Sequence, residues 1–94
     1  MYYVYILYSN SQNSYYIGQT LDIEQRINEH NSGKYSGSFT KIATDWKLYF
    51  KITCKSRTQA IKIETHIKKM KSRKYLENLK LYPGISEKLL SKYS

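Results

Sequence analysis

The chain opens on a pattern typical of two strands joined by a turn. Met1–Tyr8 is a continuous apolar and aromatic run, and its length and composition favour a strand that is buried on both faces. The polar residues Ser9–Ser14 predict a turn and Tyr15–Ile17 a second, short strand, which together make an antiparallel hairpin. We expect Gly18 to end the second strand, because a residue without Cβ lets the chain turn or pass close to another group.

The next segment has helical spacing. Asp22 and Gln25 occupy the N-cap and N3 positions of a capping-box pattern. Ile23 and Ile27 lie four residues apart and define the inward face of a helix that ends near residues 31–33. Residues 33–44 are rich in Gly, Ser and Thr and predict a loop.

Strict alternation predicts the third strand. Trp46–Ile52 alternates between hydrophobic and other positions, which is typical of an antiparallel strand with one buried face. We expect the buried face of this strand to carry Trp46, Leu48, Phe50 and Ile52. The opposite face would carry Lys47, Tyr49 and Lys51.

Helical patterns fill the rest of the chain. Ser56 and Gln59 form a capping box, and apolar residues then recur at helical spacing as far as Lys71. Residues 75–81 and 85–93 show helical spacing again, on either side of Pro83-Gly84. The predicted order is β-β-α-β-α with a helical tail, which does not alternate as a parallel α/β fold does. It indicates an α+β fold, a small three-stranded antiparallel sheet flanked by helices.

Length and composition narrow the class of protein. At roughly 100 to 200 residues per domain, a chain of 94 residues forms one domain. Its apolar runs are far shorter than the roughly 20 residues of a membrane span. The first residues have neither the basic segment nor the cleavage site of a signal peptide. Cys54 has no second cysteine for a disulfide or a cysteine zinc site. We expect a soluble cytoplasmic domain without a membrane partner.

The charge of the chain is uneven. The 16 Lys and Arg exceed the 7 Asp and Glu, for a net charge of +9. Residues 1–46 carry three basic and four acidic residues, whereas residues 47–94 carry thirteen basic and three acidic residues. Basic surfaces attract polyanions, because Lys and Arg release counterions from phosphates. The second half therefore favours a nucleic-acid partner, with a surface kept soluble by Lys as the alternative.

Two polar residues flank the apolar stripe of the first predicted helix. Arg26 and His30 are four residues apart, so they lie one above the other, next to Ile23 and Ile27. Such a pair belongs at the margin of the core or in a pocket. It is either a surface Arg beside a His bonded to a carbonyl, or part of a functional site.

Glu64 is one of only three acids in the basic half, and it lies at the edge of the apolar stripe of its helix. A partly buried carboxylate is costly unless it is paired or binds a metal. Lys68, four residues later, is the obvious ion-pair partner. The alternative is a magnesium ligand, because Mg²⁺ is often held by one or two carboxylates together with substrate phosphates.

Tyrosine makes up 11 of the 94 residues. Most of these phenols are expected to pack against the core with a hydrated hydroxyl. Tyr5 and Tyr16, however, fall on neighbouring strands of the predicted hairpin. If both point to the same side of the sheet, their hydroxyls approach each other and could hold a water molecule for attack.

Taken together, these residues resemble the GIY-YIG endonuclease superfamily, in its compact single-domain bacterial branch. Tyr3-Val4-Tyr5 stands in the place of the first triad and keeps only its Tyr, whereas Tyr16-Ile17-Gly18 is the second triad intact. Arg26 follows Gly18 by eight residues, and His30 comes four residues later. Glu64 matches the metal-binding glutamate of the family. The resemblance covers a motif core of residues 1–72 in a single domain of residues 1–94, with a helical tail at 73–94, and it implies that Gly18 shapes a turn at the site.

The resemblance also implies an activity, the hydrolysis of DNA phosphodiester bonds with one divalent metal, Mg²⁺ or Mn²⁺. The catalytic residues it implies are Tyr5, Tyr16, Arg26, His30 and Glu64. Glu64 would ligate the metal, and Tyr5 would be the leading candidate for activating the attacking water, assisted by Tyr16. Arg26 would stabilise charge on the phosphate, and His30 would orient groups or relay a proton.

Five basic residues follow Glu64, namely Lys68, Lys69, Lys71, Arg73 and Lys74. We expect them to bind the DNA backbone without sequence specificity. A solvated helix end is the alternative for this cluster. The predicted activity is nicking by a monomer or weak homodimer, with little sequence specificity or a preference for DNA structure, in DNA repair or recombination. Two alternatives remain open: a non-catalytic nucleic-acid-binding module, and an interaction subunit that retains the nuclease fold.

Overall fold

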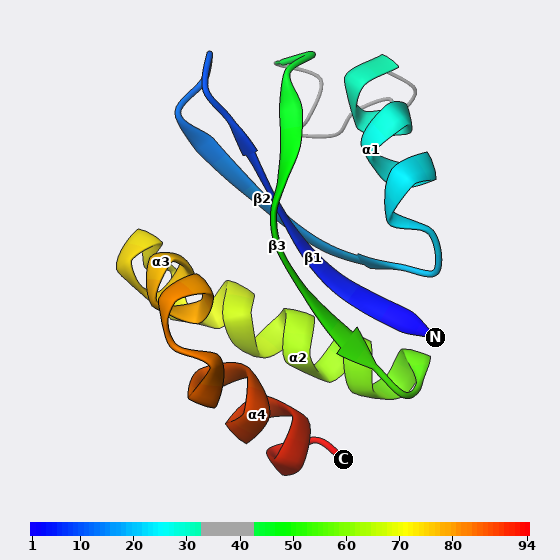
Figure 1. The fold of residues 1–94 in the computed structure, drawn as a ribbon, viewed down its shortest axis with the longest axis vertical. Coiled ribbons are helices and arrows are strands. Elements are labelled where there is room, and N and C mark those ends of the chain that lie inside the picture. The colour runs from blue at the N-terminus through cyan, green and yellow to red at the C-terminus, as the bar shows by residue number, and fades with distance from the viewer. Residues whose placement is uncertain (33–42) are drawn as a thin grey trace.

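The computed structural model describes residues 1–32 and 43–94, and it confirms the predicted order of strands and helices (Figure 1). The elements are β1 (Tyr2–Ser9), β2 (Ser14–Thr20), α1 (Ile23–Ser32), β3 (Trp46–Cys54), α2 (Arg57–Met70), α3 (Arg73–Leu81) and α4 (Pro83–Lys92). The predicted loop of residues 33–44 lies outside the described residues, apart from its last two.

The three strands form an antiparallel sheet in the order β2-β1-β3, so the most apolar strand is the central one. Val4, Tyr5, Ile6 and Leu7 of β1 are each no more than 1% exposed. The prediction that this strand is buried on both faces is confirmed. Burial on both faces follows from the continuous run of large apolar side chains, because successive residues of a strand point to opposite faces.

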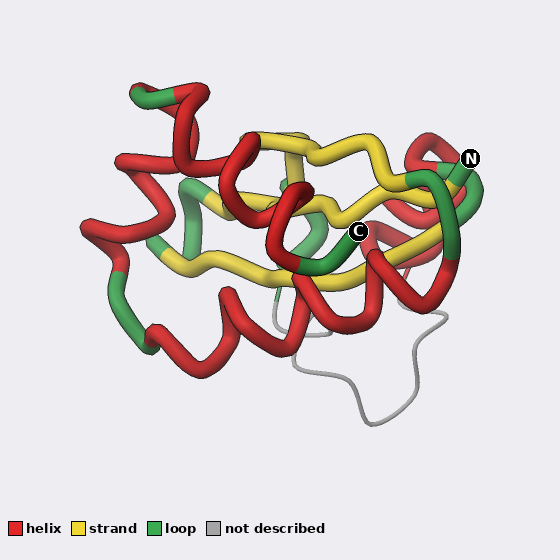
Figure 2. Tube along the Cα trace, turned by 90° about the horizontal axis from the view of Figure 1, so that it is seen from below, coloured by secondary structure: helices red, strands yellow, loops and turns green. Residues whose placement is uncertain are grey.

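Each face of the sheet has its own helices and its own core. Val4 and Ile6 belong to the larger hydrophobic cluster, which they share with α2, α3 and α4. Tyr5 and Leu7 belong to a smaller cluster on the other face, where Ile23 of α1 packs. Figures 1 and 2 show the same division, with α1 apart from α2 and α4, which lie in front of the strands when the molecule is seen from below.

The face predicted for β3 is wrong, because a β-bulge divides the strand. Ile6 pairs with Phe50 but Leu7 pairs with Leu48, which leaves Tyr49 as the extra residue. An extra residue reverses the alternation of side chains beyond it. Trp46 consequently packs in the smaller cluster with α1, whereas Ile52 packs in the larger cluster with α2. Leu48 is left 42% exposed.

The predicted helix starts are confirmed by their caps. Asp22 Oδ1 accepts a hydrogen bond from the Gln25 backbone N–H at 3.1 Å, and Ser56 Oγ accepts one from the Gln59 N–H at 3.1 Å. The Gln59 side chain does not complete the predicted capping box. It is buried, accepts from the Lys55 N–H at 2.8 Å, and donates to the Leu90 carbonyl at 3.1 Å. Gln59 therefore connects the start of α2 to α4.

The C-terminal helices complete the larger core. Leu76 and Leu79 of α3 and Leu89 of α4 are at most 6% exposed and pack in the larger cluster. Ser72 caps α3, because its Oγ accepts from the Tyr75 N–H at 3.1 Å. The tail beyond the motif core is thus an integral part of the packed domain.

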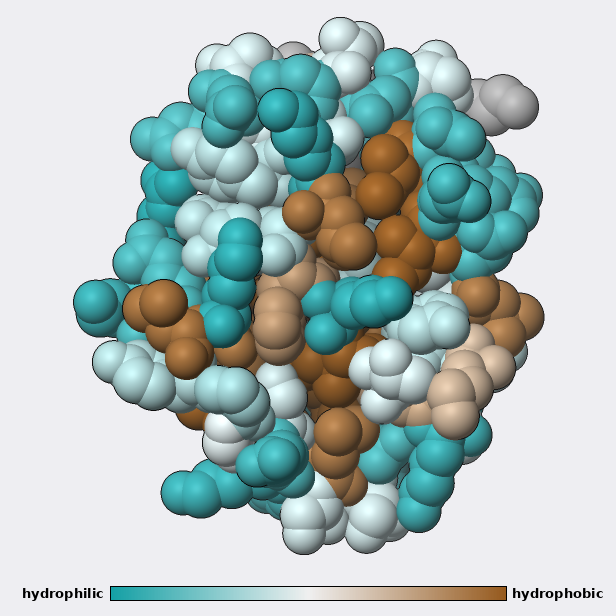
Figure 3. Space-filling view, viewed as in Figure 1, coloured by the Kyte–Doolittle hydropathy of each residue, from teal (hydrophilic) through white to brown (hydrophobic). Residues whose placement is uncertain are grey.

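The face of the molecule seen in Figure 1 is largely polar. Figure 3 shows hydrophilic residues over most of the face seen in Figure 1, with hydrophobic residues gathered between β3 and α1. Among the described helices, none is both long enough and apolar enough to cross a lipid bilayer.

The tail is expected to contribute directly to stability. Leu79 is fully buried, so Leu79→Ala removes apolar contacts and leaves a cavity, which should lower the free energy of unfolding by about 2–5 kcal/mol in urea titration. Leu81, which is 65% exposed in the same helix, is the matched control, and Leu81→Ala should change the same quantity by less than about 0.5 kcal/mol. Equal effects of the two substitutions would show that α3 is not part of the core.

Candidate active site

A close contact between β1 and β2 shapes the candidate site. Tyr5 and Gly18 are directly opposite each other in the antiparallel pair, and the Tyr5 phenol lies over Gly18. A Cβ at position 18 would come within 2.6 Å of Tyr5 Oη and 2.7 Å of Cζ, closer than van der Waals contact permits. β2 continues to Thr20, so the expectation that Gly18 ends the strand or forms a turn is wrong. Gly18 instead makes room for the phenol.

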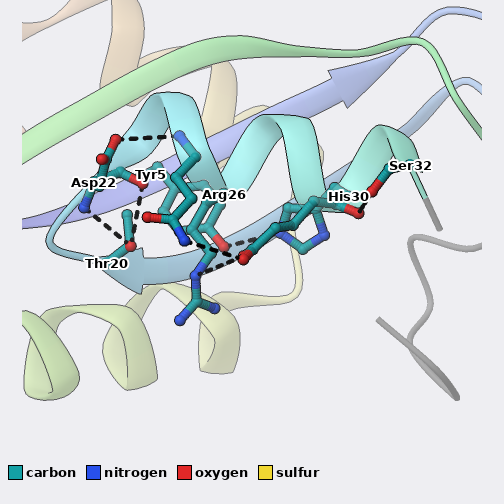
Figure 4. A network of polar contacts seen from close by, with 8 residues as sticks. Tyr5, Thr20, Asp22, Arg26, His30 and Ser32 are labelled. Carbon is teal, nitrogen blue, oxygen red and sulfur yellow. Dashed lines mark hydrogen bonds and ion pairs between the residues drawn. The ribbon is translucent and has the colours of Figure 1, made fainter. Parts of the chain in front are cut away.

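His30 meets the hydroxyl of this phenol. Tyr5 Oη and His30 Nε2 are 3.0 Å apart and form a buried hydrogen bond, and each residue is 1% exposed. Figure 4 shows Arg26 and His30 on the side of α1 that faces Tyr5. A buried hydroxyl is costly without a partner, so this bond stabilises one orientation of the Tyr5 side chain.

Asn31 holds the C-terminal end of α1 against the sheet. Its side-chain nitrogen donates to the Trp46 carbonyl at 3.0 Å, and its oxygen accepts from the Trp46 N–H at 2.7 Å. The amide therefore pairs with the first residue of β3 as another strand would. Sequence reasoning missed this role, because an Asn at the end of a helix is also a common feature of turns.

Tyr16 completes an aromatic group on the α1 face of the sheet. It lies opposite Leu7, so it shares a face with Tyr5, a question that the spacing leaves open. Its ring centroid is 4.7 Å from that of His30 and 6.2 Å from that of Tyr5. Unlike Tyr5, Tyr16 is partly exposed. Of the two phenols, Tyr16 is therefore the one in contact with solvent.

The environment of His30 favours its neutral form. Burial lowers the pKa of His30 below its ordinary value, the positive charge of Arg26 lowers it further, and Glu29 opposes them. A neutral imidazole has one nitrogen that donates and one that accepts a hydrogen bond. His30 can thus either donate a hydrogen bond to the Tyr5 hydroxyl or accept one from it.

Arg26 extends from α1 toward solvent. Its Nε lies 3.5 Å from Glu29 Oε1, and its side chain is 39% exposed, so this is a surface ion pair of small energy. Arg26 also lines a hollow of about 320 Å³ that reaches across to Arg57 at the start of α2. The guanidinium is therefore accessible to an anion without disturbing the core.

Glu64 comes from the other side of the sheet. It lies on α2, and its carboxylate forms an ion pair with Lys68 at 2.8 Å, with the Glu64 side chain 16% exposed. This is the ion pair that the spacing predicts. Such a pair at i and i+4 is worth only about 0.3–0.5 kcal/mol, so a cation of higher charge could displace Lys68.

The chemistry of Glu64 fits a hard divalent cation held mainly by substrate. Within residues 1–32 and 43–94, no group of three or more His, Cys, Asp or Glu side chains is placed to enclose a metal ion. Mg²⁺ is commonly bound through one or two carboxylates, with phosphate oxygens and water as its other ligands. A single accessible carboxylate is sufficient for that arrangement.

The predicted cluster of cations does not form one surface. Lys68, Lys71 and Arg73 line a hollow beside the β1–β2 turn. Lys69 lines a different hollow, together with His66 and Met70. Lys74 is exposed on α3.

Comparison with known proteins shows which family the chain belongs to. Residues 1–80 match the family described as the GIY-YIG catalytic domain. The chain belongs to the GIY-YIG family. A UPF0213 protein of Syntrophus aciditrophicus is 41% identical over 81 residues, which cover 86% of this chain and 92% of that protein. The UPF0213 protein YazA of Bacillus subtilis is 32% identical over 62 residues, which cover 66% of this chain and 62% of YazA. No solved structure matches significantly.

The GIY-YIG triads have clear structural roles in this chain. The first triad lies in the central strand, where Val4 is buried in the larger core and Tyr5 in the smaller one. In the second triad, Ile17 faces the larger core, whereas Tyr16 and Gly18 face α1. The triads thus place two phenols and a glycine on one face of the sheet, opposite α1.

The close contact at Gly18 should not tolerate a methyl group. Gly18→Ala should displace the Tyr5 ring, disrupt its hydrogen bond to His30, and lower the free energy of unfolding by about 1–3 kcal/mol. Gly84, which has open space around it in α4, is the control. Gly84→Ala should be neutral or stabilising by up to about 1 kcal/mol in the same urea titrations. A Gly18→Ala protein as stable as the parent would exclude this tight contact.

The lowered pKa of His30 should make stability depend on pH. Because the unfolded chain takes up the proton first as pH falls, the contribution of His30 is present above about pH 6.5 and is lost as pH falls through the folded-state pKa. NMR titration should find the His30 pKa below about 6.5. The pKa of His66 is also lowered, so His30→Gln should reduce the loss of stability on acidification without abolishing it. A His30 pKa at or above the model-peptide value would contradict its burial against Tyr5.

Proposed function

We propose that this chain is a divalent-metal-dependent DNA endonuclease that hydrolyses phosphodiester bonds. The observation that carries the proposal is the buried Tyr5–His30 hydrogen bond with Tyr16 against the same imidazole, in a chain of the GIY-YIG family. Packing alone would be served equally well by apolar side chains at Tyr5, Tyr16 and His30. It combines two phenols with a neutral imidazole, which is a plausible set for proton transfer.

Hydrolysis of a phosphodiester requires a group that takes a proton from the attacking water. The exposure of the two phenols favours Tyr16 for this task, because Tyr5 is only 1% exposed and its hydroxyl is bonded to His30. Tyr16 is partly exposed, and its ring is close to His30. We therefore assign Tyr16 to the water. Tyr5 holds His30 in place, and the neutral imidazole accepts the phenolic proton that Tyr16 gives up as its oxygen takes the proton of the water.

Arg26 supplies a fork of N–H donors for the phosphate. A guanidinium can bind two phosphate oxygens at once and stabilise the charge that develops on them. The exposed ion pair with Glu29 is weak enough to exchange for a phosphate. Arg57 lines the same hollow and adds a second positive charge, beside the carboxylates of Asp22 and Glu29.

Glu64 would hold the divalent metal. When bound, Mg²⁺ or Mn²⁺ would stabilise negative charge on the phosphate and orient it. Glu64 must release Lys68 to bind it, and the released ammonium would then lie beside the substrate backbone. A single set of these residues would cut one strand at a time. Nicking with little sequence specificity, or with a preference for DNA structure, fits a role in DNA repair or recombination.

A nucleic-acid-binding module without turnover is the second candidate. The observation in its favour is the ion pair of Glu64 with Lys68, which occupies the only carboxylate assigned to the metal. If that pair persisted in the presence of magnesium, the cations of α2 would still bind DNA but the bond would not be cut.

A plasmid-nicking assay tests the proposal. The protein should convert supercoiled plasmid to the open circle with Mg²⁺ or Mn²⁺ and should fail to do so with a chelator. Tyr16→Phe should slow nicking by about a hundredfold or more, because it removes a group that transfers a proton. Glu64→Gln should abolish metal-dependent nicking while leaving the protein folded.

Matched variants control for surface and charge effects. Tyr82→Phe removes the same hydroxyl from a residue that is 58% exposed. This variant should nick plasmid as fast as the parent protein. Glu87→Gln removes the same charge from an exposed acid on α4, and this variant should also be active. Nicking that persists in chelator or in Glu64→Gln would reject the metal mechanism. Binding without nicking under all conditions would favour the module.

A further inference from the structure

A hollow beside the β1–β2 turn has the charge of a phosphate site. It lies where α2 meets α3, and its volume is about 310 Å³. Three cations line it, Lys68, Lys71 and Arg73, and none of the described residues in its lining is acidic. In the described part of the chain, Lys71 and Arg73 form no ion pair with a carboxylate, so their charge is available to an anion.

Arg73 is held in place by groups from the hairpin. Its Nη2 donates to Asn13 Oδ1 at 2.7 Å, and Tyr8 Oη donates to the same oxygen at 2.6 Å. The guanidinium also lies 5.0 Å from the ring centroid of Tyr15, whose ring packs against Tyr8 and Tyr49. A guanidinium has five N–H donors, so the contact with Asn13 leaves donors for a phosphate. The side chain is thus ordered before any ligand binds.

The turn that carries Asn13 is itself tied to the sheet. The Asp45 carboxylate accepts from Ser9 Oγ at 2.6 Å and from the Ser11 backbone N–H at 2.9 Å. Asn13 has a positive φ of 48°, a conformation that Asn adopts more readily than most residues. Hydrogen bonds therefore stabilise the turn that carries Asn13, and Asn13 in turn orients Arg73.

Lys71 reaches the hollow because the chain turns sharply there. It is the C-cap of α2 in the left-handed conformation, with φ 46° and ψ 43°. This turn separates α2 from α3 and brings Lys71 and Arg73 to the rim of the same hollow. Two cations converge from the ends of two helices.

The base of the hollow is apolar. Its apolar lining consists of Ile17, Ile67, Leu76 and Tyr15, of which Ile67 and Leu76 are buried and so form its deeper part. An apolar surface under a cationic rim suits a sugar and base whose phosphate is bound at the rim. The volume is at the lower limit of small-molecule pockets, roughly 300–1,000 Å³, which is enough for one nucleotide and too small for a duplex.

The hollow is continuous with the proposed metal ligand. Lys68 lines it and also forms the ion pair with Glu64. From Glu64 to Lys71 the chain advances seven residues, which is roughly 10 Å along a helix, so the hollow lies within a few nucleotides of a phosphate held at Glu64. We propose that this hollow is a subsite for a single nucleotide of the cut strand, close to the cleaved bond, with its phosphate on Lys71 and Arg73. The inference rests on the proposed endonuclease function.

A scan of single neutral phosphates tests the subsite. Short single-stranded and duplex oligonucleotides each carry one methylphosphonate, moved position by position along the cut strand. Binding to the Glu64→Gln protein is measured by fluorescence anisotropy, and cutting by the parent protein is measured in parallel. We expect one position, within a few nucleotides of the cut, at which neutralisation weakens binding roughly tenfold, the effect of losing a charge-assisted hydrogen bond. An abasic nucleotide at that position should also weaken binding.

Two variants connect the position to the hollow. Lys71→Asn removes the charge and keeps a residue that tolerates positive φ, and Arg73→Gln removes the guanidinium. Either should weaken binding of unmodified DNA, and together they should abolish the extra loss caused by the methylphosphonate. Lys62→Asn removes the same charge from the other side of α2 and should leave the scan unchanged. Because Arg73 also supports the hairpin, Lys71→Asn is measured alone and each variant is checked by urea unfolding.

The outcomes separate the two proposals. If the parent protein cuts DNA but no position is sensitive to a methylphosphonate, the subsite is rejected and the endonuclease proposal stands. The same holds if a sensitive position is found but persists in the Lys71 and Arg73 variants. A sensitive phosphate with no effect of the abasic nucleotide would reject the role of the apolar base. Failure of the parent protein to bind or cut any DNA would reject both.

Discussion

The burial of one tyrosine hydroxyl is the constraint on which the candidate site depends. Tyr5 stands in the central strand and is only 1% exposed, so its hydroxyl must find a partner inside the protein. His30 provides that partner, and Gly18 provides the space for the ring. α1 must therefore lie where His30 can reach Tyr5, and the Asn31 side chain keeps it there by pairing with β3. The position of α1 in turn directs Arg26 toward solvent.

The sheet divides the proposed chemistry between its two faces. The phenols, the imidazole and Arg26 belong to the α1 face, and Glu64 and its neighbouring cations belong to α2 on the other. β2 is one of the two edge strands, and it carries Tyr16 and packs against α2. A DNA strand that reached both groups would run along this edge. The phosphate to be cut would therefore lie at this edge, in reach of both groups, and the strand would continue from it to the hollow at Arg73.

Most of the elements follow from local patterns, and the differences come from pairing between distant segments. The capping residues Asp22 and Ser56 mark the helix starts correctly, because a cap bonds to backbone only three residues away. The alternation of β3 is read wrongly, because the bulge at Tyr49 depends on its register with β1. Gln59 has the spacing of a capping box, yet its amide bonds to Leu90 in a helix that packs nearby only after folding. Local spacing cannot contain that information.

For the candidate site, the sequence alone determined the residue types and their order: two tyrosines on paired strands, Arg26 and His30 one helical turn apart, and Glu64 in a basic segment. The tertiary structure decided which of them meet. It buried Tyr5 and left Tyr16 at the surface, because β1 is central and β2 is an edge strand. It also divided a continuous basic segment into separate surfaces, since residues adjacent in a helix point in different directions. Spacing defines a face of one element, but only packing defines which faces come together.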